Sequence, residues 1–324
     1  MKFINLKVIA FIIFGFLLIT VNAQTKSVSI TQGNEQLNCT YPLNKGRIDG
    51  NYVSYYKNGK KRAEGRLEDG CRTGKWSVWD STGRLRMERD YENAYVYKTM
   101  VPAGTKDTAS YRIVRGDDGL LGYFKLREKA VFWSQRIWRN IEKENNEMLF
   151  DGDRLFKFYY ENLLNGELKG YGTSDDEFKT ALGLSDIQKI DTHKISIIRY
   201  KMKEDAFFDT DRNVYEVRII GICPVGLNKE TGKTEDLFWI YYPNTRKLLA
   251  KEAVNDKRHA DKIRTLDDLF FYRNFASTIY KQSNVWDKTI ADSWQYKEDQ
   301  VKEAERIELA LIENEHDIWI GMTK

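Results

Sequence analysis

Histidine, cysteine and proline are scarce in this chain, whose 324 residues include 3 His, 3 Cys and 4 Pro. His193, His259 and His316 lie far apart, and none belongs to an H-E-x-x-H motif. The sequence also lacks G-x-S-x-G, Walker and G-x-G-x-x-G patterns. His316, between Glu315 and Asp317, is better explained as a structural histidine near a helix end than as a proton-transfer group. We therefore predict a protein that is not an enzyme and that uses no cofactor or metal.

Long hydrophobic runs are also rare, and the one that stands out spans residues 8–19. It is shorter than the roughly 20 residues that cross a bilayer. Lys2 and Lys7 precede it, and Val21 and Ala23 supply small side chains at positions −3 and −1 of a cleavage site. These features predict a secretory signal peptide over residues 1–23 and export to the periplasm.

Composition favours a folded chain, because 13% of the residues are aromatic and 31% are charged. The net charge is +4. Residues 24–99 contain 14 Lys and Arg against 9 Asp and Glu, which gives 14 − 9 = +5. This bias is compatible with an anionic surface or an acidic partner, but it is too weak to indicate nucleic acid.

The three cysteines are Cys39, Cys71 and Cys223. In an oxidising compartment they can form at most one intramolecular pair. Cys39–Cys71 is the pair favoured by sequence proximity, and three unpaired thiols are the default. Cys223 has no histidine nearby in the sequence to activate it, so we expect a small buried hydrophobe there.

One acidic segment resembles the start of a calcium loop: Asp209-x-Asp211-x-Asn213. The sixth position is valine instead of glycine and the twelfth is isoleucine instead of glutamate, so the loop pattern fails. We predict an acidic turn between two strands. Glu204 and Asp205 with Asp209 also suggest a carboxylate pair for glycoside hydrolysis, but nothing else in the chain indicates a sugar cleft.

A repeat with an offset of 24 residues occupies the N-terminal part of the chain. Its two units are Gly46-x-x-x-Gly50-Asn51-Tyr52-x-x-Tyr55-x-x-x-Gly59 and Gly70-x-x-x-Gly74-Lys75-Trp76-x-x-Trp79-x-x-x-Gly83. Each unit predicts a β-hairpin, with Gly59 or Gly83 in the turn. Tyr52, Tyr55, Trp76 and Trp79 are expected to pack from one hairpin to the next, and a sugar-binding platform is the minor alternative. The pattern resembles MORN-like repeats.

Helical and strand patterns alternate after residue 128. Helical spacing is seen in Ala130, Trp133, Ile137 and Ile141, in 155–164 and in 297–319. Ser174 and Thr265 are candidate helix caps. Strands are predicted over 194–200, 215–219 and 237–242, with a hairpin turn at 228–233. The expected fold class is α+β: a small antiparallel β-hairpin repeat module followed by a helix–strand–helix α+β domain.

We divide the chain at changes of pattern. The segments are 1–23 (signal peptide), 24–45 (N-terminal segment), 46–99 (hairpin repeats), 100–127 (linker) and 128–320 (α+β domain).

Seven stretches of the last segment resemble the GldN/PorN family of gliding motility proteins and occur in its order. They are Trp133-Ser134-x-x-Ile137-Trp138, Tyr200-x-x-x-Glu204-Asp205-x-x-Phe208-Asp209, Val217-Arg218-Ile219-Ile220-Gly221-Ile222-x-Pro224, Leu237-Phe238-Trp239-x-Tyr241-x-Pro243, Thr265-x-Asp267-Asp268-Leu269-Phe270, Ser283-Asn284-Val285-Trp286-Asp287 and Glu315-His316-Asp317-x-Trp319. The N-terminal hairpin module departs from what we expect of the family.

The resemblance implies a periplasmic structural subunit of the type IX secretion and gliding machinery. It implies assembly into a ring with a GldK/PorK-like outer-membrane lipoprotein, self-association, and contact with the periplasmic part of the inner-membrane motor proteins. Tryptophan is enriched at interface hot spots, so Trp133, Trp138, Trp286 and Trp294 are candidate interface anchors. The alternative is a stand-alone periplasmic adaptor whose repeats hold a protein or a cell-envelope ligand.

Overall fold

The computed structural model describes residues 24–93, 96–101, 115–255 and 262–322. The predicted signal peptide, residues 102–114 of the predicted linker and His259 lie outside these residues. In the described part of the chain, no helix is long and apolar enough to span a bilayer.

The first sheet is built from the N-terminal third of the chain, and all its neighbouring strands pair antiparallel. Its order is β1-β2-β4-β5-β6-β7-β8, with β3 paired to β2. The strands are β1 (Gln24–Gln32), β2 (Glu35–Asn44), β3 (Arg47–Ile48), β4 (Gly50–Tyr56), β5 (Lys61–Glu68), β6 (Cys71–Trp79), β7 (Leu85–Asn93) and β8 (Val96–Val101). Segment 24–45 is therefore part of the same sheet as the repeat units.

The two sequence repeats correspond to successive antiparallel pairs, β4 with β5 and β6 with β7. Gly59 and Gly83 have φ values of +81° and +89° in the connecting turns. Glycine fits there because a Cβ is disfavoured at positive φ. Asn58 Nδ2 donates to the carbonyl oxygen of Ser81 at 3.0 Å, so one turn is bonded to the next. The relationship to MORN-like repeats stays a prediction.

The second sheet has the order β10-β14-β12-β11-β9-β15, with β13 paired to β12. The strands are β9 (Val131–Glu142), β10 (Gly170–Tyr171), β11 (Ile195–Asp209), β12 (Val214–Asn228), β13 (Thr234–Asp236), β14 (Trp239–Tyr241) and β15 (Thr278–Gln282). The long hairpin of β11 and β12 is its centre, and the predicted turn at 228–233 joins β12 to β13.

Short helices flank the second sheet, and one long helix ends the chain. The helices are η1 (Glu128–Ala130), α1 (Glu147–Phe150), η2 (Asp151–Asp153), α2 (Arg154–Leu164), α3 (Leu184–Gln188), η3 (Tyr242–Asn244), α4 (Arg246–Leu249), α5 (Leu266–Phe271), α6 (Ile290–Ser293) and α7 (Lys297–Met322). The predicted capping box of α5 is present: the hydroxyl of Thr265 accepts from the backbone N–H of Asp268.

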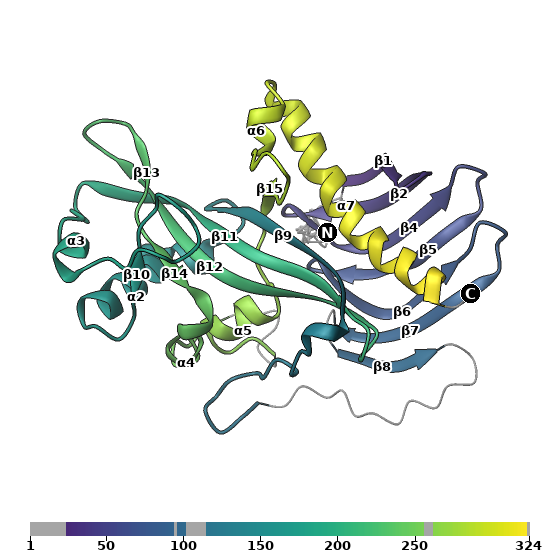
Figure 1. The fold of residues 1–324 in the computed structure, drawn as a ribbon, viewed down its shortest axis with the longest axis horizontal. Coiled ribbons are helices and arrows are strands. Elements are labelled where there is room, and N and C mark those ends of the chain that lie inside the picture. The colour runs from purple at the N-terminus through teal and green to yellow at the C-terminus, as the bar shows by residue number, and fades with distance from the viewer. Residues whose placement is uncertain (1–23, 94–95, 102–114, 256–261, 323–324) are drawn as a thin grey trace, which may run out of the picture.

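Helix α7 lies against both sheets and crosses the first one (Figure 1). Its residues Leu309, Ile318 and Trp319 belong to the buried core of the first sheet. Its residues Ala304, Ile307 and Leu311 pack with Ile137, Ala206 and Ile279 of the second sheet. A separate apolar core lies between the second sheet and α1, α2 and α5. Residues from the two ends of the sequence therefore fold together.

The α+β class is confirmed, with two predicted helices wrong. Residues 130–141 form mostly strand β9. Its successive residues Ile137, Trp138 and Arg139 are all buried, so both faces are covered there, and Trp133, Ile137 and Ile141 also fit a two-residue period. No helix begins at Ser174. The acidic side chains there instead contact the sheet: Asp176 accepts from Lys203 and from the Trp138 indole. The helix over 155–164 and the terminal helix from Lys297 are confirmed.

Candidate functional site

Acidic side chains of α7 form ion pairs with bases on both sheets, in an arrangement that we call the α7 seam. The pairs are Lys26–Glu305, Arg139–Glu308, Arg62–Glu313, Arg72–Glu315 and Arg62–Asp317. Because the bases come from β1, β5, β6 and β9, a single helix links strands that are far apart in the sequence.

Arg62 and Glu313 are the most deeply buried pair of the seam, with 1% and 0% of their side chains exposed. Arg62 Nε lies 2.6 Å from Glu313 Oε2. The Tyr52 hydroxyl donates to Glu313 Oε1 at 2.7 Å, and His316 Nδ1 lies 3.1 Å from Oε2. Burial alone would raise the pKa of Glu313, but His316 and Arg62 favour the charged carboxylate, and the pKa is well below its ordinary value.

A second buried cluster joins α7 to the second sheet. Arg139 Nε lies 2.5 Å from Glu204 Oε1, and its Nη1 lies 2.6 Å from Glu308 Oε2. Arg273 pairs with the other oxygen of Glu204 at 2.8 Å. Burial raises the pKa of Glu204, but Arg273 and Arg139 outweigh it and the pKa is lowered. Glu204 is therefore a charged structural group.

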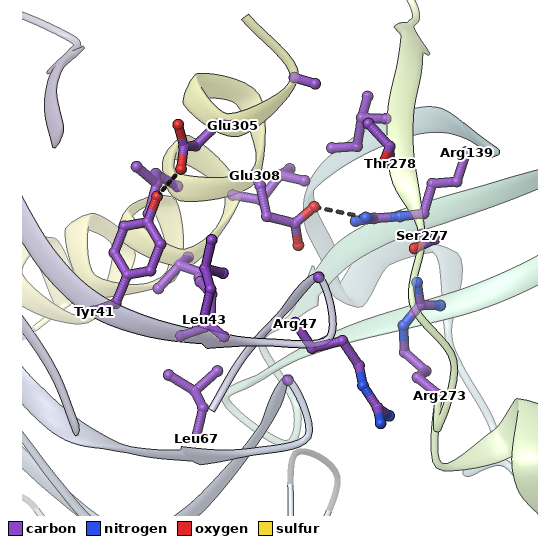
Figure 2. Close-up of a pocket in the computed structure, with 18 of the residues that line it drawn as sticks. Tyr41, Leu43, Arg47, Leu67, Arg139, Arg273, Ser277, Thr278, Glu305 and Glu308 are labelled. Carbon is purple, nitrogen blue, oxygen red and sulfur yellow. Dashed lines mark hydrogen bonds and ion pairs between the residues drawn. The ribbon is translucent and has the colours of Figure 1, made fainter. Parts of the chain in front are cut away.

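A cavity of about 290 Å³ opens beside the seam, between the first sheet, α7 and residues 273–279 (Figure 2). Two contacts line it: Tyr41 donates a hydrogen bond to Glu305, and Glu308 pairs with Arg139. Arg47 also lines it and pairs with Asp69 at 2.9 Å. These charged groups already pair with groups of opposite charge inside the protein. We therefore interpret the cavity as a gap between packed elements of the fold.

His316 is placed for structure. Its side chain is 0% exposed and lies between the rings of Trp76 and Trp319, at centroid distances of 5.7 and 5.8 Å. Its Nδ1 atom faces Glu313. A substrate in solvent has no route to this imidazole, which agrees with the structural interpretation.

The cysteines are free thiols, and the Cys39–Cys71 pair is not formed. Cys39 and Cys223 are buried, and Cys71 Sγ donates to the carbonyl oxygen of Tyr272 at 3.1 Å. Burial raises the pKa of Cys71 to about 11 and that of Cys39 to about 12. Both thiols are therefore protonated at neutral pH and are poor nucleophiles.

The segment that resembled a calcium loop is the turn between β11 and β12, as predicted. Asp209 accepts from Arg212 Nε at 2.6 Å, and Asp211 forms two bonds with Arg127 at 2.6 and 2.5 Å. Both carboxylates are held by guanidinium groups.

The carboxylates considered for glycoside hydrolysis do not face one another. Glu204 and Asp205 are successive residues of β11, so their side chains lie on opposite faces of the sheet. Glu204 is buried beside Arg139 and Arg273, while Asp205 pairs with Arg136 at 2.8 Å on the other face.

The four aromatic residues of the repeats divide into two pairs. Tyr52 and Trp76 are 0% exposed, lie under α7 and have ring centroids 5.8 Å apart. Tyr55 and Trp79 are half-buried. Trp76 packs so closely on Gly65 that a Cβ there would lie 2.1 Å from the indole. This pair therefore contributes to the core and is not a sugar platform.

The four candidate anchor tryptophans also divide into two pairs. Trp138 is only 5% exposed, with Lys281 Nζ 4.4 Å from its ring centroid, and Trp133 is half-buried beside α7. Trp286 and Trp294 are 78% and 44% exposed. Only the latter pair is available to a partner without rearrangement.

The exposed pair lies on what we call the tip, residues 283–296, which connects β15 to α7 at the top of Figure 1. Val285 and Tyr296 add further apolar surface, with exposed fractions of 93% and 68%. Asn284 orders the tip: its Oδ1 accepts from the backbone N–H of Trp286 and Lys288, and its Nδ2 donates to the carbonyl oxygens of Gln282 and Lys288. The aromatic side chains thus project from an ordered loop.

Sequence reasoning missed the seam. Arg62 and Arg139 sit at inward positions of strands, where charged residues are usually excluded. The sequence held one signal of their partners, at the other end of the chain. There the acidic residues Glu308, Glu313 and Glu315 interrupt the apolar side of the terminal helix. This interruption identifies the acids as buried only when their basic partners on the distant strands are known.

Comparison with known proteins matches the second sheet and α7 to one family. A family model described as gliding motility associated protein GldN matches residues 126–320. No curated protein matches the chain significantly. The match covers more than half of the sequence. The chain therefore belongs to the GldN family of gliding motility associated proteins.

Proposed function

We propose that this chain is a non-enzymatic structural subunit of the type IX protein secretion and gliding machinery. In this proposal it is exported by its signal peptide and works in the periplasm, near the outer membrane. It assembles into a ring with a GldK/PorK-like lipoprotein and meets the periplasmic part of the motor proteins. The family match over residues 126–320 carries the proposal.

The chemistry of the fold supports a structural role. Glu313 of α7 is buried beside Arg62 of β5, and His316 packs on Trp76 of β6. Glu204 is buried beside Arg139, whose second partner is Glu308 of α7. The Cys39 and Cys71 thiols are protonated at neutral pH, because burial raises their pKa values. These residue types do catalytic work when solvent and substrate reach them, and here they stabilise the fold instead.

The tip supports an assembly role. Trp286, Trp294 and Tyr296 stay in solvent on an ordered loop, although burial of such side chains releases about 1.5–3 kcal/mol each. A partner that covers them gains this free energy without having to order the loop. We therefore assign the contact with the lipoprotein or with a neighbouring subunit to this surface.

The proposal is tested by purifying the tagged full chain from native membranes in mild detergent. The expected result is a large complex that contains a lipoprotein and appears ring-shaped by electron microscopy. A chain recovered alone from the periplasm, with secretion and gliding intact in a deletion strain, would contradict the proposal. That outcome would favour the stand-alone adaptor.

A further inference from the structure

Among the residues that the structure describes, strand β1 is an open edge of the first sheet. It pairs with β2 on one side through nine successive residue pairs and ends the strand order on the other. Among the described strands at sheet ends it is the longest, with 9 residues against 6 for β8 and 5 for β15. An open edge of this length presents unpaired backbone groups to any extended chain.

The usual protections of an edge are missing from β1. It contains no proline, and its pairing with β2 has no register shift, whereas the pairings of β4 through β8 each have at least one. Its one charged residue, Lys26, does not guard the edge, because it pairs with Glu305 of α7 at 3.0 Å. Natural edge strands usually carry a bulge, a proline or a free charge to prevent pairing.

The sequence of β1 is nearly the same in both directions. Read inward from either end, QTKSVSITQ has Gln, then Thr, then a position that differs between the two ends, then Ser, with Val28 at the centre. Only Lys26 and Ile30 break the symmetry. An antiparallel pair of two such strands with a two-fold axis at Val28 would place like residues opposite each other. This self-complementarity is what an isologous contact requires.

The two faces of β1 suit such a pair. Thr25, Ser27, Ser29 and Thr31 are exposed on the outer face, where hydroxyl pairs across strands are favourable. Val28 and Ile30 lie on the inner face and pack in the core of the first sheet. Each Lys26 would face Ile30 of the second copy while keeping its own Glu305, so no charge would be left unpaired.

We propose that β1 pairs with β1 of a second copy of this chain, antiparallel and in the register that places the two Val28 residues together. The first sheets of two subunits then form one continuous sheet. This contact is separate from the tip, and it does not depend on the proposed role in secretion. It joins subunits in pairs through a surface outside the segment that matches the family.

The test uses the chain without its predicted signal peptide and measures its oligomeric state by sedimentation velocity across a wide range of concentrations. In the proposed register, Ser27 faces Ser29 of the second copy. Ser27→Asp with Ser29→Asp therefore places carboxylates opposite each other at two points. We expect the dimer dissociation constant to rise roughly tenfold.

Two matched variants separate this effect from misfolding. Ser27→Lys with Ser29→Lys should also dissociate, and an equimolar mixture of the Asp and Lys variants should form heterodimers. Ser27→Asp with Ser29→Lys should pair as the unchanged chain does, because opposite charges then meet. Pairing with a different protein, or through the tip, would leave these charge patterns without effect on self-association. A monomeric unchanged chain, or equal self-association of all variants, would overturn the proposal.

Discussion

The acidic residues of the α7 seam and the tip lie on one continuous stretch, residues 283–317, yet they reverse the usual distribution of side chains. In the seam, Glu313 and its partner Arg62 are almost fully buried. In the tip, Val285 and Trp286 are 93% and 78% exposed. Buried charges require partners of opposite charge that are fixed in place, whereas exposed apolar side chains stabilise a complex when a partner protein buries them. The comparison separates residues that hold the fold from residues left for assembly.

The largest expected effect is at the centre of the seam. Arg62→Ala leaves Glu313 buried without its main ion-pair partner, and we expect the free energy of unfolding to fall by about 3–5 kcal/mol in urea titrations. Lys61→Ala on the same strand is the control, since the Lys61–Glu64 pair is 38% and 48% exposed and should contribute less than about 1 kcal/mol. Equal effects of the two changes would contradict a structural role for the seam.

Acid should weaken the same contact. The pKa of Glu313 in the folded chain is below its ordinary value of 4.5, so its stabilisation is complete above pH 4.5 and is lost as the pH falls toward the folded pKa. Glu313→Gln should lower stability at neutral pH by about 3 kcal/mol and flatten the decline in acid. Unfolding free energies measured at several pH values check this. If the stability of the variant fell in acid as steeply as that of the unchanged chain, Glu313 would be excluded as a source of the acid sensitivity.

Packing of the repeats gives a smaller effect. Gly65→Ala would place a Cβ 2.1 Å from the Trp76 indole, and we expect a loss of about 1–3 kcal/mol from overpacking. Gly122→Ala is the control, because nothing lies within 4 Å of its added Cβ. Thermal unfolding distinguishes the two. If Gly65→Ala were as stable as Gly122→Ala, the contact between β5 and β6 would be looser than described.

Local patterns predicted much of this fold because they depend on nearby residues. The capping box of Thr265 and Asp268, the helix over 155–164 and the turn glycines Gly59 and Gly83 follow from short-range geometry. The seven family stretches, from Trp133 to Trp319, also lie within the segment that matches the family, residues 126–320.

Long-range pairing explains what the sequence did not predict. Arg139 occupies an inward position of β9, so a charged residue interrupts the alternation of apolar and polar residues that marks a strand. The buried charge is tolerated because Glu204 and Glu308, from distant segments, neutralise it. Asp176 resembled a helix-start acid but pairs with Lys203, which is 1% exposed. The exposure of the candidate anchor tryptophans also depends on the fold and not on the local sequence. Neighbouring residues of the sheet bury Trp138, whereas Trp286 lies exposed on the tip.

The most direct test of the central comparison is a double substitution of the tip, Trp286→Ala with Trp294→Ala, in the full chain. Leu184→Ala, which removes a 52% exposed side chain from α3, is the matched control. We expect the double variant to keep its free energy of unfolding within about 0.5 kcal/mol per substitution and to lose co-purification of the lipoprotein or of a neighbouring subunit. A clear fall in stability, or complexes recovered as from the control, would contradict the assignment of the tip to assembly.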